Sequence, residues 1–166
     1  MADVHSARIR SKNMRAISSC DTAIERRLAD LLTMFDLRFN TQDGTLPGRP
    51  DFVLPEYQAV IFTHSCFWHR HQCNLFKIPA TRTEFWLKKI NANVCRDNSN
   101  RMKLNTQGWR VLVVWECAMR GRHKLSDEAL QVRLEEWICA GGNDSEIDSS
   151  GLHLCYSHKD ESFNQQ

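Results

Sequence analysis

Two short apolar segments on either side of one long helical segment constrain the fold of this chain most strongly. Residues 59–63 and 110–116 are rich in β-branched and apolar side chains, as buried strands are. Residues 82–107 between them repeat apolar side chains at helical spacing. A strand, a helix and a strand in this order predict a βαβ unit with parallel strands. If the strands are adjacent, the residues that follow them should meet at one edge of the sheet.

Capping signals mark where the helices begin. Thr22 and Glu25 form a capping box ahead of a helix predicted over residues 22–36. Thr81 and Glu84 form a second capping box, which predicts the start of the long central helix.

Turn and cap residues place the other elements. Residues 52–54 and 59–62 are predicted to form a hairpin across the intervening Pro55-Glu-Tyr. Ser126 is predicted to cap a last helix that ends near Trp137. The order of the elements is therefore mixed α/β.

The chain of 166 residues is long enough for one domain with a substantial core. We expect a basic arm over residues 1–20, a folded domain over 21–155 and a flexible, polar tail over 156–166. No apolar run is long enough to span a bilayer, and the N-terminus lacks the apolar stretch of a secretory signal. The expected location is the cytoplasm, where thiols stay reduced.

Seven cysteines in a reducing compartment suggest a metal site. Cys66, His69, His71 and Cys73 lie within eight residues. His71 suits the ligand role better than His69, since its two-residue step to Cys73 puts both on one side of an extended segment. Cys117 follows the second parallel strand and is the expected fourth ligand of a structural, tetrahedral zinc site. The alternative is that these cysteines are small buried hydrophobes, as we expect for the others.

Charge is unevenly distributed along the chain. Residues 67–110 hold nine Lys or Arg against two acids, whereas residues 111–166 hold five against ten. A basic segment with several aromatic side chains is typical of a surface that follows a nucleic-acid backbone. The alternative, which charge alone favours slightly, is a solvated helix face.

Asp51 begins one strand of the predicted hairpin, and Thr63 and His64 end the other. These positions can meet if the hairpin is in register. A carboxylate at a sheet edge beside histidines and a basic face suits Mg²⁺ and phosphate. From the Pro-Asp dipeptide alone, an Asp that closes a turn is the better explanation.

Two further acids lie on the predicted helices. Asp97 shares the helix face that carries Leu87, Ile90 and Leu104. A carboxylate on a face that packs against the sheet needs a partner, and a histidine is the expected one. Glu25 is explained by capping alone, so on pattern alone catalysis is the less favoured role for it.

Five ordered blocks of sequence resemble one known family. The blocks are Asn13–Ile17, Leu46–Val53, Val60–His69, Pro79–Trp86 and Val114–Ala118. Together they resemble the very-short-patch repair (Vsr) mismatch endonucleases over about residues 8–155. The resemblance implies a variant restriction-endonuclease-like fold, a central mixed β-sheet flanked by helices, with a structural zinc site. It also implies an enzyme that nicks one DNA strand 5′ to the thymine of a T·G mismatch, in the hemimethylated context left by a cytosine-5 methyltransferase.

The resemblance implies the magnesium ligands by motif position. They would be Asp51 and the main-chain carbonyl of Thr63. The usual restriction-type pattern has an acid and a lysine where Thr63 and His64 stand. This pair therefore argues for the repair branch and against an ordinary restriction enzyme.

The resemblance also implies the remaining catalytic roles. His69 would be the general base for the attacking water, with Asp97 as its orienting carboxylate. Glu25 and His64 would be supporting groups in the active site. One departure is that a stretch often richer in histidine reads His-Arg-His-Gln over residues 69–72, which leaves fewer alternative metal ligands.

Aromatic residues carry mismatch recognition in the family that the chain resembles. Phe67, Trp68 and Trp86 would form a wedge beside the mismatch, because inserted rings bend and open a base step and a mismatched step opens more easily. Core packing is the alternative for Trp86, since Ile90 lies one helical turn away. In the basic arm, the residues expected to contact DNA are Arg8, Arg10, Lys12, Met14 and Arg15.

The predicted cofactors are Mg²⁺ for catalysis and Zn²⁺ for structure. The expected partner is double-stranded DNA with a T·G mismatch, mismatch-repair proteins are candidate further partners, and we expect a monomer that is nucleoid-associated on DNA. Two alternatives are a zinc-stabilised DNA-binding module without chemistry and a restriction enzyme that cuts both strands. A binding module has no need for Asp51 and Asp97 to converge on histidine, which favours the enzyme.

Overall fold

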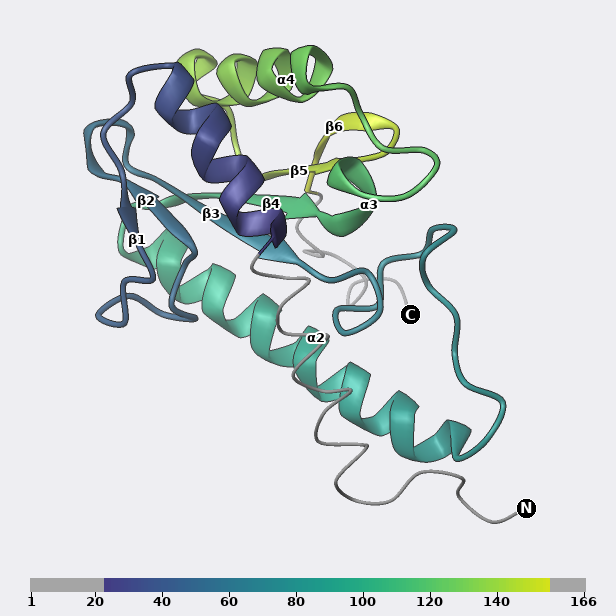
Figure 1. The fold of residues 1–166 in the computed structure, drawn as a ribbon. Coiled ribbons are helices and arrows are strands. Elements are labelled where there is room, and N and C mark those ends of the chain that lie inside the picture. The colour runs from purple at the N-terminus through teal and green to yellow at the C-terminus, as the bar shows by residue number, and fades with distance from the viewer. Residues whose placement is uncertain (1–22, 156–166) are drawn as a thin grey trace, which may run out of the picture.

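The computed structural model describes residues 23–155 and contains a mixed sheet between two layers of helix (Figure 1). The six strands lie in sequence order across the sheet: β1 (Asn40–Thr41), β2 (Phe52–Leu54), β3 (Ala59–His64), β4 (Arg110–Trp115), β5 (Ser145–Asp148) and β6 (Gly151–Leu154). β4 pairs in parallel with β3 and with β5, and the outer pairs are antiparallel. The expected α/β class with a central mixed sheet is confirmed.

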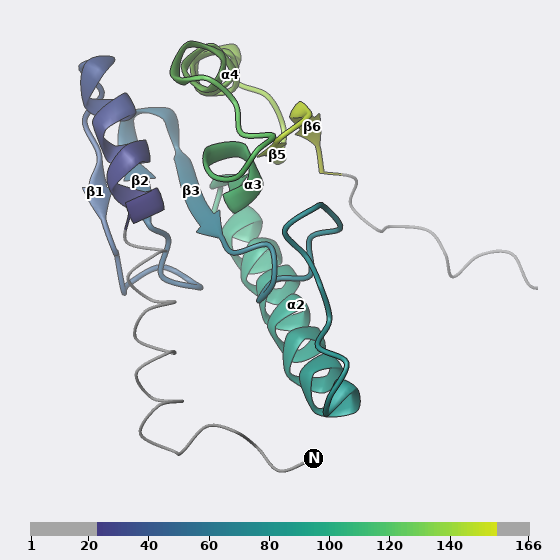
Figure 2. The ribbon, with the colours of Figure 1, turned by 45° about the vertical axis from the view of Figure 1, so that its right-hand side comes forward.

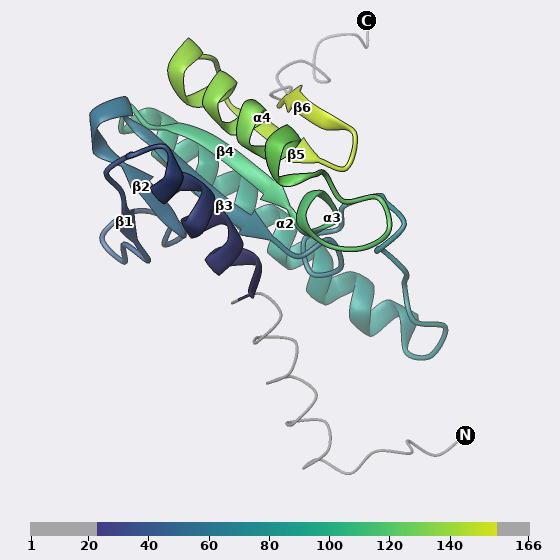
Figure 3. The same cartoon turned by 45° about the horizontal axis from the view of Figure 1, so that its top comes forward.

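Helices cover both faces of the sheet. α2 (Thr83–Thr106) crosses one face, while the first helix (residues 23–34, without a label in Figure 1) and α4 (Asp127–Ala140) lie on the other. Figure 3 shows the first helix and α4 in front of the sheet and α2 behind it. Short pieces complete the chain, namely the 3₁₀ turn η1 (Pro55–Tyr57) and α3 (Glu116–Met119).

Alternation along the central strands gives each face of the sheet its own core. In β3, Ala59 and Ile61 join the large core under the first helix and α4. The intervening Val60 instead packs with Leu104 of α2 and with Val111 of β4. Helices therefore pack against both faces of the sheet.

The βαβ prediction is confirmed by β3, α2 and β4. The two strands are parallel and adjacent, and His64 at the end of β3 lies opposite Trp115 at the end of β4. The loop that follows β3 and the α3 turn that follows β4 therefore start side by side. This arrangement brings Cys66 and Cys117 together.

The start of α2 differs from the prediction. Its N-cap is Arg82 in a left-handed conformation (φ 56°), with no side-chain cap hydrogen bond. The Thr81 capping box is therefore wrong, because the left-handed break at Arg82 leaves Thr81 outside the helix. The hydroxyl of Thr83 instead donates to the carbonyl of Pro79 at 3.0 Å.

The cap of the last helix is confirmed. The Ser126 hydroxyl accepts a hydrogen bond from the main-chain N–H of Ala129 at 3.1 Å. α4 runs to Ala140, beyond the predicted end near Trp137, and stops where Gly141 takes a left-handed conformation (φ 67°).

The N-terminal half of α2 extends beyond the sheet, beside the loop that follows β3 (Figure 2). Ile90 and Leu104 are its buried residues, and Lys88, Lys89 and Arg96 are exposed. Among residues 23–155, no helix has the length and apolar character needed to cross a membrane. The predicted arm over 1–20, the Thr22 cap and the tail over 156–166 lie outside the described residues.

Candidate active site and metal site

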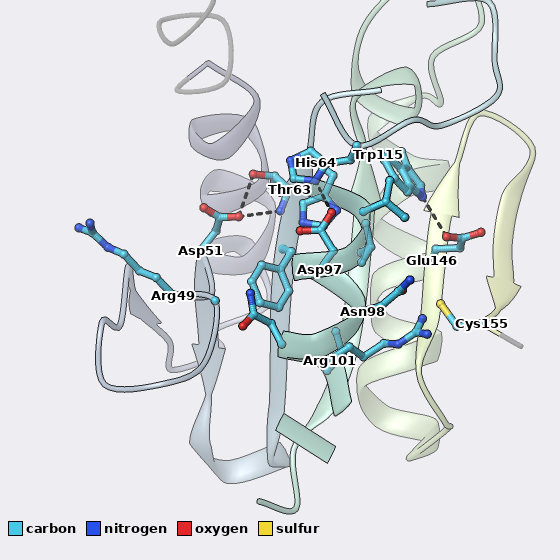
Figure 4. A pocket seen from close by; sticks show the side chains of 17 residues that line it. Arg49, Asp51, Thr63, His64, Asp97, Asn98, Arg101, Trp115, Glu146 and Cys155 are labelled. Carbon is cyan, nitrogen blue, oxygen red and sulfur yellow. Dashed lines mark hydrogen bonds and ion pairs between the residues drawn. The ribbon is translucent and has the colours of Figure 1, made fainter. Parts of the chain in front are cut away.

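A cavity of about 340 Å³ opens on the α2 side of the sheet, near the ends of β3 and β4 (Figure 4). Its lining contains most of the residues predicted for catalysis and magnesium binding: Asp51, Thr63, His64, His69 and Asp97. These residues come from β3, α2, the loop after β3 and the position just before β2. The predicted convergence of acids and histidines is therefore present.

Asp51 is fixed by the strand beside it. Its Oδ2 accepts hydrogen bonds from the main-chain N–H of Thr63 at 2.7 Å and from the Thr63 hydroxyl at 3.1 Å (Figure 4). These bonds follow from the antiparallel register of β2 and β3, in which Phe52 lies opposite Ile61. The carboxylate therefore has a defined orientation at the cavity. An Asp that only closed a turn would not need these contacts with the neighbouring strand.

Gln42 connects Asp51 to Glu25 of the first helix. Its side-chain amide donates to Oδ1 of Asp51 at 2.9 Å and to Oε2 of Glu25 at 3.1 Å. The residue has a left-handed backbone (φ 52°). Glu25 does not line the cavity, but it is one hydrogen-bonded residue away from it.

His69 is held by Asp97 on the opposite side of the cavity. Nδ1 of His69 lies 2.5 Å from Oδ2 of Asp97. Both side chains are partly exposed, at 24% and 29%. The expected histidine partner of Asp97 is therefore His69. Nε2 of His69 has no hydrogen-bond partner within residues 23–155, so it is available to a substrate or water.

His64 lies between the rings of His69 and Trp115. The two imidazole rings are 3.8 Å apart and 4° from parallel, and the Trp115 ring meets His64 edge-on at 5.5 Å. Burial, and then the neighbouring His69, lower the pKa of His64 well below its usual value. His64 is therefore neutral at neutral pH, and its ring packs on that of His69.

Cys66, His71, Cys73 and Cys117 form the predicted metal cluster. Their donor atoms all lie within 4.8 Å of one another. Nδ1 of His71 is 3.5 Å from the Cys66 sulfur and 3.6 Å from the Cys117 sulfur. A left-handed turn at Arg70 (φ 55°) separates His71 from the preceding histidine.

The four side chains of the cluster change one another's pKa values through direct contact. A hydrogen bond from Cys66 and a further one from His71 lower the pKa of Cys117 to about 4, against the opposing effect of burial. Contact with Cys117, together with burial, raises the pKa of Cys66, and burial raises that of Cys73. Burial alone would lower the pKa of His71, but Cys117 raises it. Thiols this close can all ionise only if a cation neutralises them. Three sulfur donors and one imidazole nitrogen suit Zn²⁺.

Aromatic side chains gather where the loop after β3 meets the start of α2. The ring centroids of Phe67, Trp68 and Trp86 are 5.0–5.9 Å apart, and all three residues are half-buried. Phe85 lies beside them and is 44% exposed, with the Arg82 guanidinium 4.6 Å from its ring centre. Trp86 thus belongs to a partly exposed aromatic cluster and lies outside the main cores.

Gln42, Phe85 and Trp115 lie at these sites although no sequence pattern predicted them. No motif marks Gln42, which contacts both carboxylates only because the chain folds back on itself between them. Trp115 could have been found, because the parallel register that selected Cys117 also puts Trp115 opposite His64. The predicted arm residues, Arg8 to Arg15, lie outside the described residues.

The chain has a mixed sheet, with the Asp51 carboxylate near its edge and the His69–Asp97 pair facing the same cavity. This combination defines a restriction-endonuclease-like protein. The chain belongs to the DNA mismatch endonuclease Vsr family, whose family model matches residues 2–75. It is 65% identical over 154 residues to the DNA mismatch endonuclease Vsr of Escherichia coli (strain K12), which covers 93% of this chain and 99% of that relative.

More distant relatives are nicking enzymes by name. The chain is 39% identical to the type II nicking enzyme V.XorIIP of Xanthomonas oryzae pv. oryzae, over 81% of this chain and 95% of that protein. It is 38% identical to the type II nicking enzyme V.NmeAIP of Neisseria meningitidis serogroup A, over 74% of this chain and 87% of that protein.

Proposed function

We propose that this chain is a magnesium-dependent endonuclease that nicks one DNA strand 5′ to the thymine of a T·G mismatch and so starts very-short-patch repair. The observation that carries the proposal is the convergence of Asp51, His69 and Asp97 on one cavity. The names of the relatives favour cutting of one strand over a restriction-type double cut. The same convergence argues against a DNA-binding module without chemistry.

Asp51 and the main-chain carbonyl of Thr63 are the proposed magnesium ligands. Hydrogen bonds from Thr63 already hold the Asp51 carboxylate at the sheet edge, so little reorganisation is needed for binding. When bound, Mg²⁺ would neutralise charge on the scissile phosphate as it develops.

His69 is the proposed general base. The contact of Nδ1 with Asp97 leaves Nε2 as the atom that takes a proton from water. Asp97 fixes the ring orientation and stabilises the imidazolium that results. His64 supports the ring from its other side, and because it is neutral it does not oppose protonation of His69.

Glu25 is proposed to act indirectly. It shares the Gln42 amide with Asp51, so it helps to hold that amide in place. This role fits a residue that lies one layer behind the cavity.

The cysteine cluster is the proposed zinc site, and its role is structural. Cys66 and Cys117 are buried, and four converging donors leave no open position for a substrate. The cluster ties the loop after β3 to the α3 turn after β4. That loop carries both His69 and the aromatic cluster, so the zinc would order the catalytic base and the recognition surface together.

Phe67, Trp68 and Trp86 are the proposed mismatch wedge. Their partial exposure, where the loop after β3 meets the start of α2, suits insertion into a duplex. Exposed Lys88 and Lys89 on the same helix could then lie along the phosphates. The N-terminal arm is proposed to add further phosphate contacts through Arg8, Arg10, Lys12 and Arg15, with Met14 beside them. Monomeric action, nucleoid association and contact with mismatch-repair proteins stay predictions.

Strand-resolved nicking tests the proposed function. Duplexes that differ only in T·G or matched pairs, with the two strands carrying different labels, would be incubated with the enzyme and Mg²⁺. We expect cleavage of the thymine strand alone, 5′ to the mismatched thymine. Cleavage of both strands of matched DNA would identify a restriction enzyme, and binding without any cleavage would identify a binding module.

A further inference from the structure

The turn between β5 and β6 lies against the cysteine cluster. Asp148, the last residue of β5, places its Oδ2 3.4 Å from Nε2 of His71. The main-chain N–H of Ser149 donates to the sulfur of Cys117. This turn therefore reaches two of the four proposed zinc donors, although none of its residues is a donor.

The two nitrogens of His71 have different surroundings. Nδ1 faces the sulfurs of Cys66 and Cys117, so it is the atom that would bind the metal. Nε2 must then carry the ring proton, and it faces the Asp148 carboxylate. The side chains of His71 and Asp148 are only 13% and 17% exposed, so water competes weakly for this contact.

Asp148 is itself held in place. Its other oxygen, Oδ1, accepts hydrogen bonds from the main-chain N–H of Ser150 at 2.7 Å and from Nε2 of His153 at 3.1 Å. The β5–β6 hairpin fixes His153, because Glu146 pairs with it across the two strands. Oδ2 is thus left directed to His71.

We propose that Asp148 is a positioning residue for the zinc site, which orients His71 and holds its proton on Nε2. The proposal rests on the zinc site proposed above. A carboxylate partner of this kind strengthens a histidine ligand and typically contributes about 10–100-fold to metal affinity. The β5–β6 hairpin would then stabilise the metal site from outside the ring of ligands.

The orientation of His71 also matters beyond the cluster. Its ring stacks on Trp115 with centroids 4.3 Å apart and planes 14° from parallel. Trp115 in turn contacts His64 in the catalytic cavity. Asp148 thus positions the His71 ring, which contacts Trp115, and Trp115 contacts His64.

The competing explanation is that Asp148 only closes the turn. An Asp side chain that accepts from the N–H two residues later forms an ordinary Asx turn, and Asn does this equally well. Asp148→Asn therefore separates the two roles. It keeps the acceptor for Ser150 but removes the charge, and it presents an amide where Nε2–H of His71 needs an acceptor.

The experiment is chelator competition on the zinc-loaded, full-length protein at fixed pH. We expect Asp148→Asn to weaken zinc binding by about 10–100-fold. His153→Gln, which changes the other partner of Asp148, should stay close to wild type. Wild-type affinity for Asp148→Asn would overturn the proposal. Wild-type protein that binds no zinc would instead refute the zinc site itself, so the two failures are distinguishable.

A second comparison, made in the His71→Cys variant, distinguishes the proposed role of Asp148 from a general folding defect. In His71→Cys the fourth donor becomes a thiolate, which zinc accepts and which carries no ring proton to be held. Asp148→Asn should then leave zinc affinity unchanged. An equal loss in both backgrounds would show that Asp148 acts on the turn alone and would overturn the proposal.

Discussion

Nδ1 of His69 lies 2.5 Å from Oδ2 of Asp97, although one residue sits in a loop and the other on α2. The short contact fixes the ring and leaves Nε2 directed away from the helix acid. A carboxylate that acts only through its histidine has no separate effect once the histidine is gone.

This relationship predicts non-additive kinetics. His69→Ala should lower the single-turnover nicking rate by about 10²–10⁴-fold. Asp97→Asn should lower it by at least about tenfold, because the ring loses its orienting charge. The double variant should be no slower than His69→Ala alone. Losses that multiply in the double variant would mean that Asp97 acts independently of His69.

Gln42 should contribute measurably to stability. Gln42→Leu removes the amide that donates to both Asp51 and Glu25, which leaves two acids close together. We expect the free energy of unfolding to fall by about 1–3 kcal/mol in urea denaturation. Gln107→Leu, at the exposed C-terminal cap of α2, is the matched control. Equal stability of the Gln42 variant and wild type would show that the bridge contributes nothing.

Zinc should be required for folding. Metal analysis should find one zinc per chain, and Cys73→Ser should lose both the metal and the folded circular dichroism spectrum. Cys95→Ser and Cys139→Ser should keep both, since these exposed residues lie outside the cluster. A stable, zinc-free and active Cys73→Ser protein would contradict a structural zinc site.

The aromatic cluster should supply mismatch selectivity. Stacking of one ring on a base contributes about 1–3 kcal/mol, which can offset the cost of opening a mismatched step more readily than a matched one. Trp68→Ala and Trp86→Ala should therefore weaken binding to T·G duplexes much more than to matched duplexes at fixed salt. Circular dichroism would confirm folding. Equal losses on both duplexes would assign the rings to packing.

The sequence predicted those parts of the site that follow from strand topology. The βαβ unit put the residues after β3 and β4 at one edge, and this selected Cys117 as the fourth member of the cluster. The hairpin register likewise predicted that Asp51 and Thr63 could meet. Such relationships need only the periodicity of strands and the handedness of their connection.

Features that depend on tertiary support were not predictable in this way. β5 and β6 are only four residues long each, and only Ser145, Ile147 and Gly151 in them are buried. β5 is stabilised by its pairing with β4, which no local pattern reveals. Asp148 acquires its contact with His71 only through that pairing.

Asp51 is proposed to belong to a catalytic centre that cleaves mismatched DNA. The most direct test is the single-turnover nicking rate of Asp51→Ala on a T·G duplex with Mg²⁺, measured beside its affinity for the same duplex. Asp43→Ala is the control, because that nearby acid hydrogen-bonds to Thr45 in the adjoining turn. We predict that Asp51→Ala binds like wild type but nicks more than about a hundredfold more slowly, since a metal ligand is lost. Nicking by Asp51→Ala at the wild-type rate would show that Asp51 is not part of the catalytic centre.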